Sequence, residues 1–275
     1  MAVDDNDGVE LDGGDAGAVD HVIRDVDVNT VRFRVRGVYT HRIELYDAYR
    51  DTHHGFPLMI GEDAVNNINC FKDSIPSLFH PYISRIQDVN PDGNCGFRSV
   101  AVGLGLNENR WLFIRQQLLH EMDSKEEWWR TVFDRIAFQE YDRLRHTIDW
   151  QDVKAAPVSR WMWMPYTGLL IAQRFGVIVH LLSIAGNQTF FPLWFGPHVH
   201  AQHQIVSFVH VKSAHFIHVK LDGDFPMPPT NALWNLHRND DAAEWENIYS
   251  DRIERFKKKM ATDSDNFSQY VTNYG

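Results

Sequence analysis

The sequence contains only two cysteines, Cys70 and Cys95. This scarcity excludes a fold held together by disulfides and a zinc site built from cysteines alone. No apolar run approaches the roughly 18 residues that a membrane-spanning helix needs, and the first residues are acidic, whereas a signal peptide begins with basic ones. We therefore expect an intracellular protein, cytoplasmic or nuclear, that does not associate with a membrane.

Positive charge is also scarce, with 27 Lys and Arg against 37 Asp and Glu and a net charge of −10. Residues 1–30 account for most of the imbalance, because nine acidic residues there face Arg24 alone. The rest of the chain is almost neutral and has no excess of positive charge to bind phosphates, so we expect no nucleic-acid partner. Residues 1–30 also lack large apolar side chains, which predicts a disordered acidic tail.

Hydrophobic residues are plentiful: they make up 44% of the 275 residues, which is enough for a substantial core. Apolar and basic residues alternate from residue 31 to 39, which predicts a strand within an N-terminal extension, residues 31–82, that otherwise holds short helices. The clearest patterns fall in residues 83–221, the predicted central domain. Residues 222–275 form a C-terminal extension with a predicted helix at about 241–260.

Within the central domain the spacing of apolar residues predicts both helices and strands. The expected strands are a buried run at 177–182, a short strand near Phe190 and a hairpin. The expected helices begin at Cys95, Glu108, Lys125 and Trp161. This mixture predicts an α+β fold. We list the expected segments here: helices 95–104, 108–122, 125–145 and 161–175, and hairpin strands 205–211 and 215–221.

Cys95 is the most informative residue, because it follows a polar turn and opens a predicted helix. The unpaired amide groups at a helix N-terminus favour the thiolate form of a cysteine and can also hold an oxyanion. Gly93 permits a tight turn there, and the amides around Asn94 are candidate donors. The alternative is an ordinary half-buried cysteine.

A nucleophilic cysteine needs a base, and 15 histidines offer many candidates. His215 stands out because it opens the last hairpin strand, where an imidazole can project toward a helix terminus. His210 and His218 are the alternatives, although His218 should lie on the opposite face of the strand from His215.

A second group of histidines, His198, His200 and His203, has the sequence spacing of a metal site. The group lies in a proline-bounded loop without an acidic or cysteine partner, so we interpret these side chains as solvated and expect no metal.

Residues 92–98, Asp-Gly-Asn-Cys-Gly-Phe-Arg, resemble the nucleophile motif of the ovarian tumour (OTU) family of cysteine proteases, and His215-Phe216 resembles its histidine motif. The resemblance implies a papain-like α+β fold with a small, mostly antiparallel central sheet flanked by helices. It also implies cleavage after the C-terminal glycine of ubiquitin or a ubiquitin-like modifier, without cofactor or metal. By the same resemblance, Cys95 is the nucleophile and His215 the general base and acid.

The resemblance further implies roles for three residues before and at the nucleophile. Asp92 is the motif aspartate, and Gly93, Asn94 and Cys95 supply the oxyanion environment. The flanking regions are similar to OTU-like proteins of plant and fungal genomes that are often associated with mobile elements.

One position departs from the family pattern. Many members have Asn or Asp two residues after the histidine to orient its ring, and here Ile217 occupies that position. Either the third group comes from elsewhere in the chain, or the imidazole is poorly held and the activity is weak. The candidates are Asp92, which we prefer because it belongs to the motif, and Asp88, Asn69 and Asp73.

Three functions follow from these residues. The first is a cysteine-dependent deubiquitinase, in which Trp161 and Trp163 are candidate walls of the channel for the modifier's tail. The second is a catalytically silent OTU-like module that binds ubiquitin or another protein, which Ile217 favours. The third is a papain-like amidase that acts on a different substrate.

Overall fold

The computed structural model describes residues 70–135, 139–198, 202–212 and 214–274, with side chains as far as residue 262. All described residues belong to one compact unit. The predicted acidic tail, the predicted strand at 31–39 and the candidate Asn69 lie outside the described residues.

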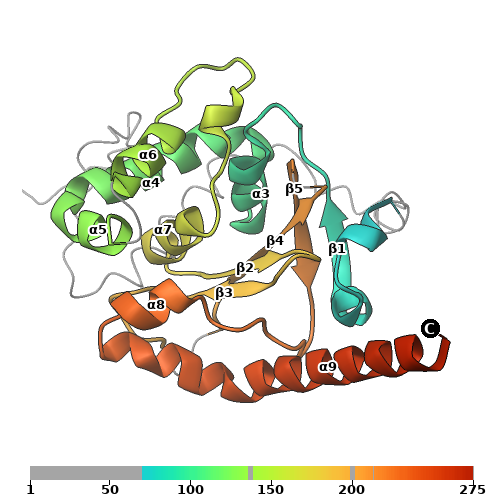
Figure 1. The fold of residues 1–275 in the computed structure, drawn as a ribbon. Helices are drawn as coiled ribbons and strands as arrows, with labels where there is room; N and C mark the ends of the chain where they lie inside the picture. Colours follow the sequence, from blue (N-terminus) through green and yellow to red (C-terminus); the bar gives the residue numbers. More distant parts are fainter. Residues whose placement is uncertain (1–69, 136–138, 199–201, 213, 275) are drawn as a thin grey trace, which may run out of the picture. The chain divides into compact units, whose positions relative to one another are not determined.

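The described residues form an α+β fold around one five-stranded sheet, as the sequence predicts (Figure 1). The strand order is β1-β5-β4-β2-β3. Only the β2–β4 pair is parallel, so the sheet is mostly antiparallel. The strands are β1 (Ile83–Gln87), β2 (Ile178–Leu182), β3 (Gln188–Phe190), β4 (Ile205–Val211) and β5 (His215–Leu221).

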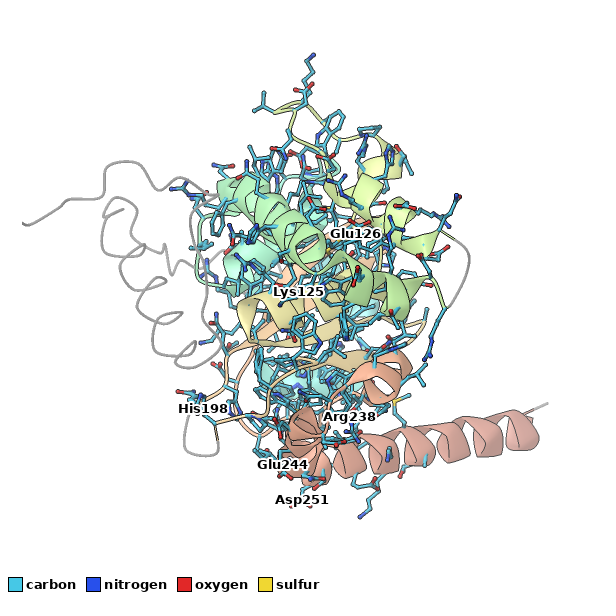
Figure 2. The ribbon with its side chains drawn as sticks, turned by 90° about the vertical axis from the view of Figure 1, so that its left-hand side faces the viewer. Lys125, Glu126, His198, Arg238, Glu244 and Asp251 are labelled. Atoms are coloured by element: carbon cyan, nitrogen blue, oxygen red, sulfur yellow. The ribbon has the colours of Figure 1, made fainter. Side chains whose placement is uncertain are left out.

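Helices cover the two faces of the sheet. Figure 1 shows α3 to α7 on one side and α8 and α9 on the other, and the turned view of Figure 2 shows the same layers, with Lys125 at the start of α5 and Asp251 on α9. The helices are α3 (Cys95–Gly103), α4 (Trp111–Ser124), α5 (Glu126–Phe133), α6 (Glu140–Ile148), α7 (Tyr166–Phe175), α8 (Ala232–His237) and α9 (Glu244–Tyr274). Short 3₁₀ helices are η1 (Lys72–Ser74), η2 (Ser77–Tyr82), η3 (Glu108–Arg110), η4 (Val158–Arg160) and η5 (Asp241–Ala243).

Both faces of the sheet are dry, which is why the central strands consist largely of apolar residues. Helix α3 packs on β4 and β5, and α7 packs on β2 and β3. On the other face, Phe191 stacks on Trp245 of α9 with ring centroids 5.7 Å apart. The helix that carries Cys95 therefore lies directly on the strand that carries His215.

The helix predicted over 125–145 is wrong in its continuity, because the structure has two helices there, α5 and α6. Asp134, just after α5, accepts a hydrogen bond from the backbone N–H of Tyr141 at the start of α6. Gln139 adopts a left-handed φ of 66°. The Asp134 carboxylate thus satisfies an amide in the first turn of α6. The chain therefore starts a new helix here, although the periodicity of apolar residues in the sequence continues without a break.

Other boundaries also differ from the predictions. Helix α7 begins at Tyr166, not at Trp161, and Pro165 immediately precedes it; proline fits the start of a helix because no hydrogen bond is needed from its nitrogen. Gly176 ends α7 in a left-handed conformation, as its position predicts. Strand β1 and helix α8 were not predicted, and α9 continues well beyond residue 260.

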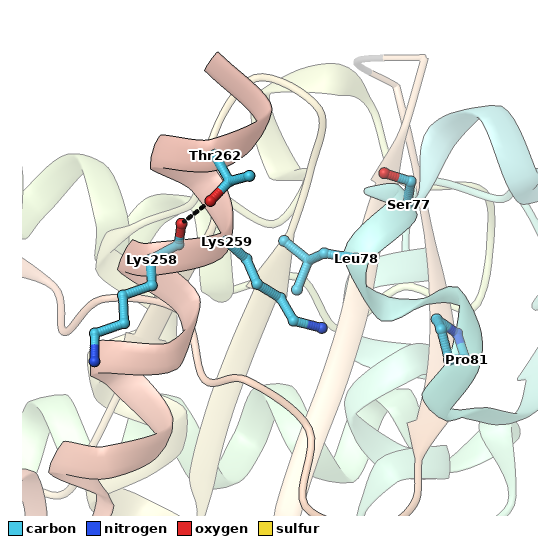
Figure 3. A pocket seen from close by; sticks show the side chains of 6 residues that line it. All are labelled: Ser77, Leu78, Pro81, Lys258, Lys259 and Thr262. Atoms are coloured by element: carbon cyan, nitrogen blue, oxygen red, sulfur yellow. Dashed lines mark hydrogen bonds between the residues drawn. The ribbon is translucent and has the colours of Figure 1, made fainter. Parts of the chain in front are cut away.

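A cavity of about 470 Å³ lies between η2 and α9 (Figure 3). Its lining residues are Ser77, Leu78, Pro81, Lys258, Lys259 and Thr262, and none of the candidate site residues is among them. Within the part of the chain that is described, no helix combines the length and the apolar character needed to cross a bilayer.

Two histidines are buried inside the fold, and they make its stability depend on pH. Burial lowers the pKa of His180 to about 3, with a further contribution from Arg252, and burial lowers the pKa of His218 to about 4. The unfolded chain binds protons at these histidines below about pH 6.5 and the folded chain does not, so acid favours unfolding.

We predict that His180→Phe makes the protein less sensitive to acid. Between pH 7.5 and 5.5, the free energy of unfolding of the variant should fall by about 1 kcal/mol less than that of the wild type, because one titrating group has been removed. Urea unfolding at both pH values measures this difference. Equal losses in the two proteins would contradict the assignment of His180 as a neutral buried group.

Candidate active site

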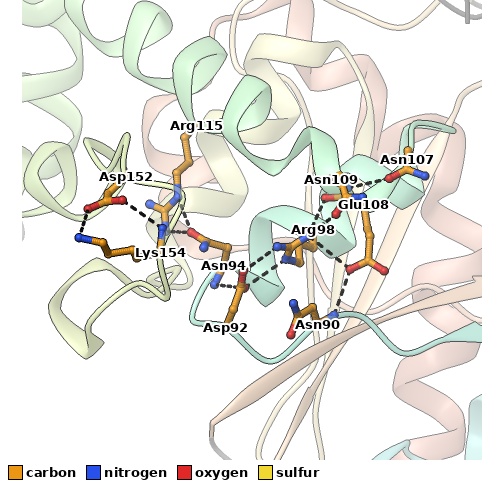
Figure 4. A network of polar contacts seen from close by, with 10 residues as sticks. All are labelled: Asn90, Asp92, Asn94, Arg98, Asn107, Glu108, Asn109, Arg115, Asp152 and Lys154. Carbon is orange, nitrogen blue, oxygen red and sulfur yellow. Dashed lines mark hydrogen bonds and ion pairs between the residues drawn. The ribbon is translucent and has the colours of Figure 1, made fainter.

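The loop before α3 is held by an ion pair between Asp92 and Arg98. The Arg98 guanidinium binds both carboxylate oxygens of Asp92, with Nη2–Oδ2 and Nε–Oδ1 distances of 2.6 and 3.1 Å (Figure 4). Asp92 Oδ1 also accepts the backbone N–H of Asn94 at 2.9 Å. Partial burial raises the pKa of Asp92, but the hydrogen bonds from Arg98 and Asn94 outweigh it, and the pKa lies below its ordinary value.

Arg98 also connects this loop to η3. Its Nη1 donates to the Asn109 side chain at 3.0 Å and lies 3.5 Å from the Glu108 carboxylate. The same carboxylate accepts the backbone N–H of Asn90 at 3.0 Å. Arg98 and Glu108 together therefore tie the loop at Asp92 and Asn90 to η3.

Gly93 occupies a position that only glycine fits. Its φ is +79°, and a Cβ there would lie 2.3 Å from the carbonyl oxygen of Ala156. The Ala156 N–H donates to the Asp92 carbonyl at 2.8 Å, and the Trp161 ring nitrogen donates to the Ala156 carbonyl at 3.1 Å. These contacts hold the segment that carries Trp161 against the loop that precedes Cys95.

Cys95 is the first residue of α3 and is only 6% exposed. Of the three amides that the resemblance implicates, the Asn94 N–H is already donated to Asp92, so the structure corrects that assignment. In the described residues no hydrogen bond uses the N–H of Gly93 or Cys95. Two amide groups therefore stay available beside the thiol.

His215 is the first residue of β5, and its ring lies between an acid and the thiol. Its Nε2 donates to Asp88 Oδ1 at 2.7 Å. Cys95, as a hydrogen-bonding neighbour, has the largest effect on the ring, and Asp88 adds to it, so the pKa of His215 is raised to about 9 although burial opposes this. Nδ1 is buried and lacks a hydrogen bond of ordinary geometry. Since Nε2 binds Asp88, Nδ1 is the nitrogen that is left for the thiol.

The acid that binds the ring is Asp88, which corrects the preference for Asp92. Asp88 follows β1 directly, and β1 runs antiparallel to β5 with Gln87 opposite His218. The end of β1 therefore lies beside the start of β5. Ile217 is fully buried in the core.

Asp73, another candidate for the third group, lies in η1 and does not hydrogen-bond to His215.

The alternative histidines lie elsewhere. The His210 ring stacks on Phe216 with centroids 4.6 Å apart. His218 is 7% exposed, and a Cβ at Gly103 of α3 would lie 3.2 Å from its ring. The Cys95 thiol has the largest influence on the pKa of His215, whereas it has no part in the lowered pKa of His210 or His218.

The histidine group at 198–203 is partly described. His203 is not solvated as expected: its Nδ1 hydrogen-bonds to the Tyr249 hydroxyl at 2.7 Å, and its Nε2 to the His198 carbonyl at 3.0 Å. His198 is labelled in Figure 2, and His200 lies outside the described residues. Over the described ranges, no three metal-ligating side chains come together.

The residue that the sequence analysis missed is Arg115. Its guanidinium is fully buried and donates to the Asn94 side chain at 2.8 and 3.1 Å. The signal available in the sequence was its spacing: Arg115 lies four residues after Trp111 and three before Leu118, and both of these are buried on α4. This spacing places a charged residue on the apolar face of the helix.

Comparisons with known proteins give structural likenesses only: no family model and no curated protein matches the chain. The OTU domain of human OTUD1 is 15% identical, with 50% of this chain and 85% of that one covered and a TM-score of 0.37. A viral OTU domain protease from Qalyub virus is 12% identical, with 52% and 87% covered and a TM-score of 0.38. The Hazara virus OTU bound to ubiquitin is 12% identical, with 55% and 87% covered and a TM-score of 0.36.

All three TM-scores are below 0.5, so nothing that follows depends on these likenesses. They also provide no support for an association with mobile elements.

We predict that the two acids of the site differ in their effect on stability. Asp92→Asn should lower the free energy of unfolding by about 3 kcal/mol, because it leaves the buried Arg98 without its partner. Asp88→Asn should lower it by less than about 1 kcal/mol, because Asp88 is half exposed to solvent. Urea unfolding at pH 7.5 compares the two variants, and equal losses would show that Asp92 does not hold the loop.

Proposed function

We propose that the chain is a cysteine-dependent hydrolase of the OTU type, which cleaves the isopeptide or peptide bond after the C-terminal glycine of ubiquitin or a ubiquitin-like modifier. The observation that carries the proposal is the position of the His215 ring. The ring is hydrogen-bonded to Asp88 on one side and lies next to Cys95 on the other, and Cys95 is the first residue of a helix. A thiol, an imidazole and an orienting acid are the groups that acyl transfer through a cysteine requires.

In this mechanism the Cys95 thiolate attacks the carbonyl carbon of the terminal glycine, and a C–S bond forms. The free N–H groups of Gly93 and Cys95 stabilise the negative charge that develops on the carbonyl oxygen. The protonated His215 then gives its proton to the leaving amine as the C–N bond breaks, which leaves a thioester and a neutral imidazole.

Hydrolysis of the thioester completes the cycle. Neutral His215 takes a proton from water, the hydroxide adds to the thioester carbonyl, and the C–S bond breaks. The thiolate and the protonated imidazole are both regenerated. The raised pKa of His215, to about 9, supports this scheme because the ring is then already protonated at neutral pH when the amine must leave.

The role of Asp88 in the proposal is to orient the ring. In a thiolate–imidazole pair, the acid accepts the hydrogen of the second ring nitrogen, keeps the first directed at the sulfur and stabilises the charged ring. Asp88 substitutes for the Asn or Asp that many family members carry at the position of Ile217. The silent-module alternative loses its main support when a neighbouring strand supplies this acid.

The choice of ubiquitin as substrate rests on the motif at residues 92–98 and on His215-Phe216. In this chain the Trp161 ring lies against Gly93, two residues before Cys95, and we take it as one wall of a narrow channel for a slender glycine-rich tail.

The first test uses ubiquitin with a thiol-reactive C-terminal group. We expect the wild type and Cys70→Ala to form a covalent adduct of one ubiquitin per chain, and Cys95→Ala and His215→Ala to form none, as measured by intact-mass spectrometry. Cys70 is the other cysteine of the chain and is exposed, so it controls for nonspecific labelling. Binding without an adduct in the wild type would indicate a silent module, and labelling only by small electrophiles would indicate another substrate.

The second test concerns Asp88. Removing its charge with Asp88→Asn should lower the pKa of His215, so the alkaline limb of the pH–rate profile should move to lower pH, and kcat/KM at pH 8 should fall about tenfold. The measurement is the hydrolysis of a fluorogenic ubiquitin amide between pH 6 and 10. An unchanged alkaline limb would exclude Asp88 as the partner of the catalytic imidazole.

A further inference from the structure

Arg115 on α4 has an unusual set of partners for a buried cation. Its side chain is fully buried, and its Nε and Nη2 both donate to the Asn94 side-chain oxygen (Figure 4). The remaining hydrogen bonds go to the backbone carbonyl oxygens of Thr147, Ile148 and Arg160, at 2.9, 3.3 and 2.8 Å. Every one of these acceptors is electrically neutral.

No carboxylate lies within ion-pair distance of Arg115 among the described residues, although a buried charge normally requires one. The other buried arginines of this layer each lie near an acid: Arg98 near Asp92, and Arg174 4.0 Å from Glu121. Burial and, to a smaller extent, the nearby charge of Arg160 lower the pKa of Arg115 to about 9. A positive charge is therefore kept in the core at a cost.

The position of Arg115 identifies the anion beside it. Its guanidinium binds the side chain of Asn94, the residue directly before Cys95 at the start of α3. In agreement with this position, Asp92 and Cys95 both favour the charged form of Arg115. Asp92 is already neutralised by its bidentate pair with Arg98. The thiolate of Cys95 is the anion that still lacks a permanent positive charge, since His215 loses and regains its proton during the proposed reaction.

The other charged groups around the start of α3 are already engaged. His215 on β5 binds Asp88, and Glu108 of η3 lies beside Arg98. His218, also on β5, is buried with a lowered pKa and carries no charge at neutral pH. Arg160, the last residue of η4, donates to the Asp149 carbonyl at 2.6 Å. Arg115 and Arg160 both donate to neutral groups, and of the two only Arg115 is fully buried.

From these contacts we infer that Arg115 is a positioning residue for the nucleophile: its fixed positive charge favours the thiolate of Cys95, and its double hydrogen bond to Asn94 sets where α3 begins. This inference deepens the proposed function and rests on Cys95 being the nucleophile. It differs from the role of His215, because a guanidinium keeps its charge through the whole cycle and never exchanges a proton with the substrate.

The test measures how readily Cys95 ionises, without any ubiquitin. In a Cys70→Ser background, Cys95 is the only cysteine, so the rate of iodoacetamide alkylation as a function of pH reports its thiolate fraction. We expect Arg115→Gln to move the midpoint of this profile to higher pH and to reduce the alkylation rate at pH 6 about tenfold. Arg115→Lys, which keeps the charge but loses the double hydrogen bond, should keep the rate within about threefold of the parent.

A matched control is Arg174→Gln, which removes another buried arginine whose guanidinium binds Gln117 on α4, away from Asn94. It should lower the melting temperature and leave the alkylation profile unchanged. A folded Arg115→Gln protein with the parent profile would overturn the inference. So would an Arg115→Lys protein whose profile shifts as much as that of Arg115→Gln, because the charge would then not be the cause.

If Arg115→Gln does not fold, Asn94→Asp gives a second test, because it places a carboxylate of the same shape on the guanidinium and neutralises it. The inference requires this variant to alkylate more slowly at pH 6 while its melting temperature is maintained, and a parent-like rate would overturn it. Because alkylation needs no modifier, these results are independent of whether ubiquitin is the substrate. If the wild type forms no adduct with ubiquitin but Arg115→Gln shifts the alkylation profile as expected, the proposed function is overturned and the inference about Arg115 is not.

Discussion

The bidentate ion pair between Asp92 and Arg98 is the interaction on which the geometry of the site depends. It closes the loop that precedes Cys95 onto the second turn of the helix that Cys95 begins. Because both groups are largely removed from water, neither can leave the pair without a large loss of solvation. The pair therefore holds the loop in a conformation in which the amides of Gly93 and Cys95 make no hydrogen bond to any described residue.

The orientation of the imidazole depends on a different constraint, the pairing of the edge strand β1 with β5. This pairing brings Asp88 to His215 and leaves Ile217 free to fill the core. The ring comes from β5 and the acid from the residue just after β1, so the geometry of the site depends on the register between these two strands. Asp88 is also partly open to water, so its effect on the ring is weaker than that of a buried acid would be.

Much of the fold was predictable because the sequence carries strong local signals. The start of α3, the end of α7 at Gly176 and both strands of the β4–β5 hairpin are confirmed. The division between α5 and α6 was not predictable, because the apolar periodicity continues across it and the break depends on a side-chain cap by Asp134. Strand β1 was missed because an edge strand of five residues with a partly exposed, mixed pattern resembles a loop.

By itself, the sequence determined the α+β class and the position of Cys95 at a helix start, because both depend on local patterns, and a short motif made His215 the candidate base. Only the tertiary structure decided which acid hydrogen-bonds to the imidazole and which buried cation binds the loop before Cys95. Asp88 and Arg115 reach the site through strand pairing and helix packing, and such contacts between distant parts of a chain leave no local pattern in its sequence.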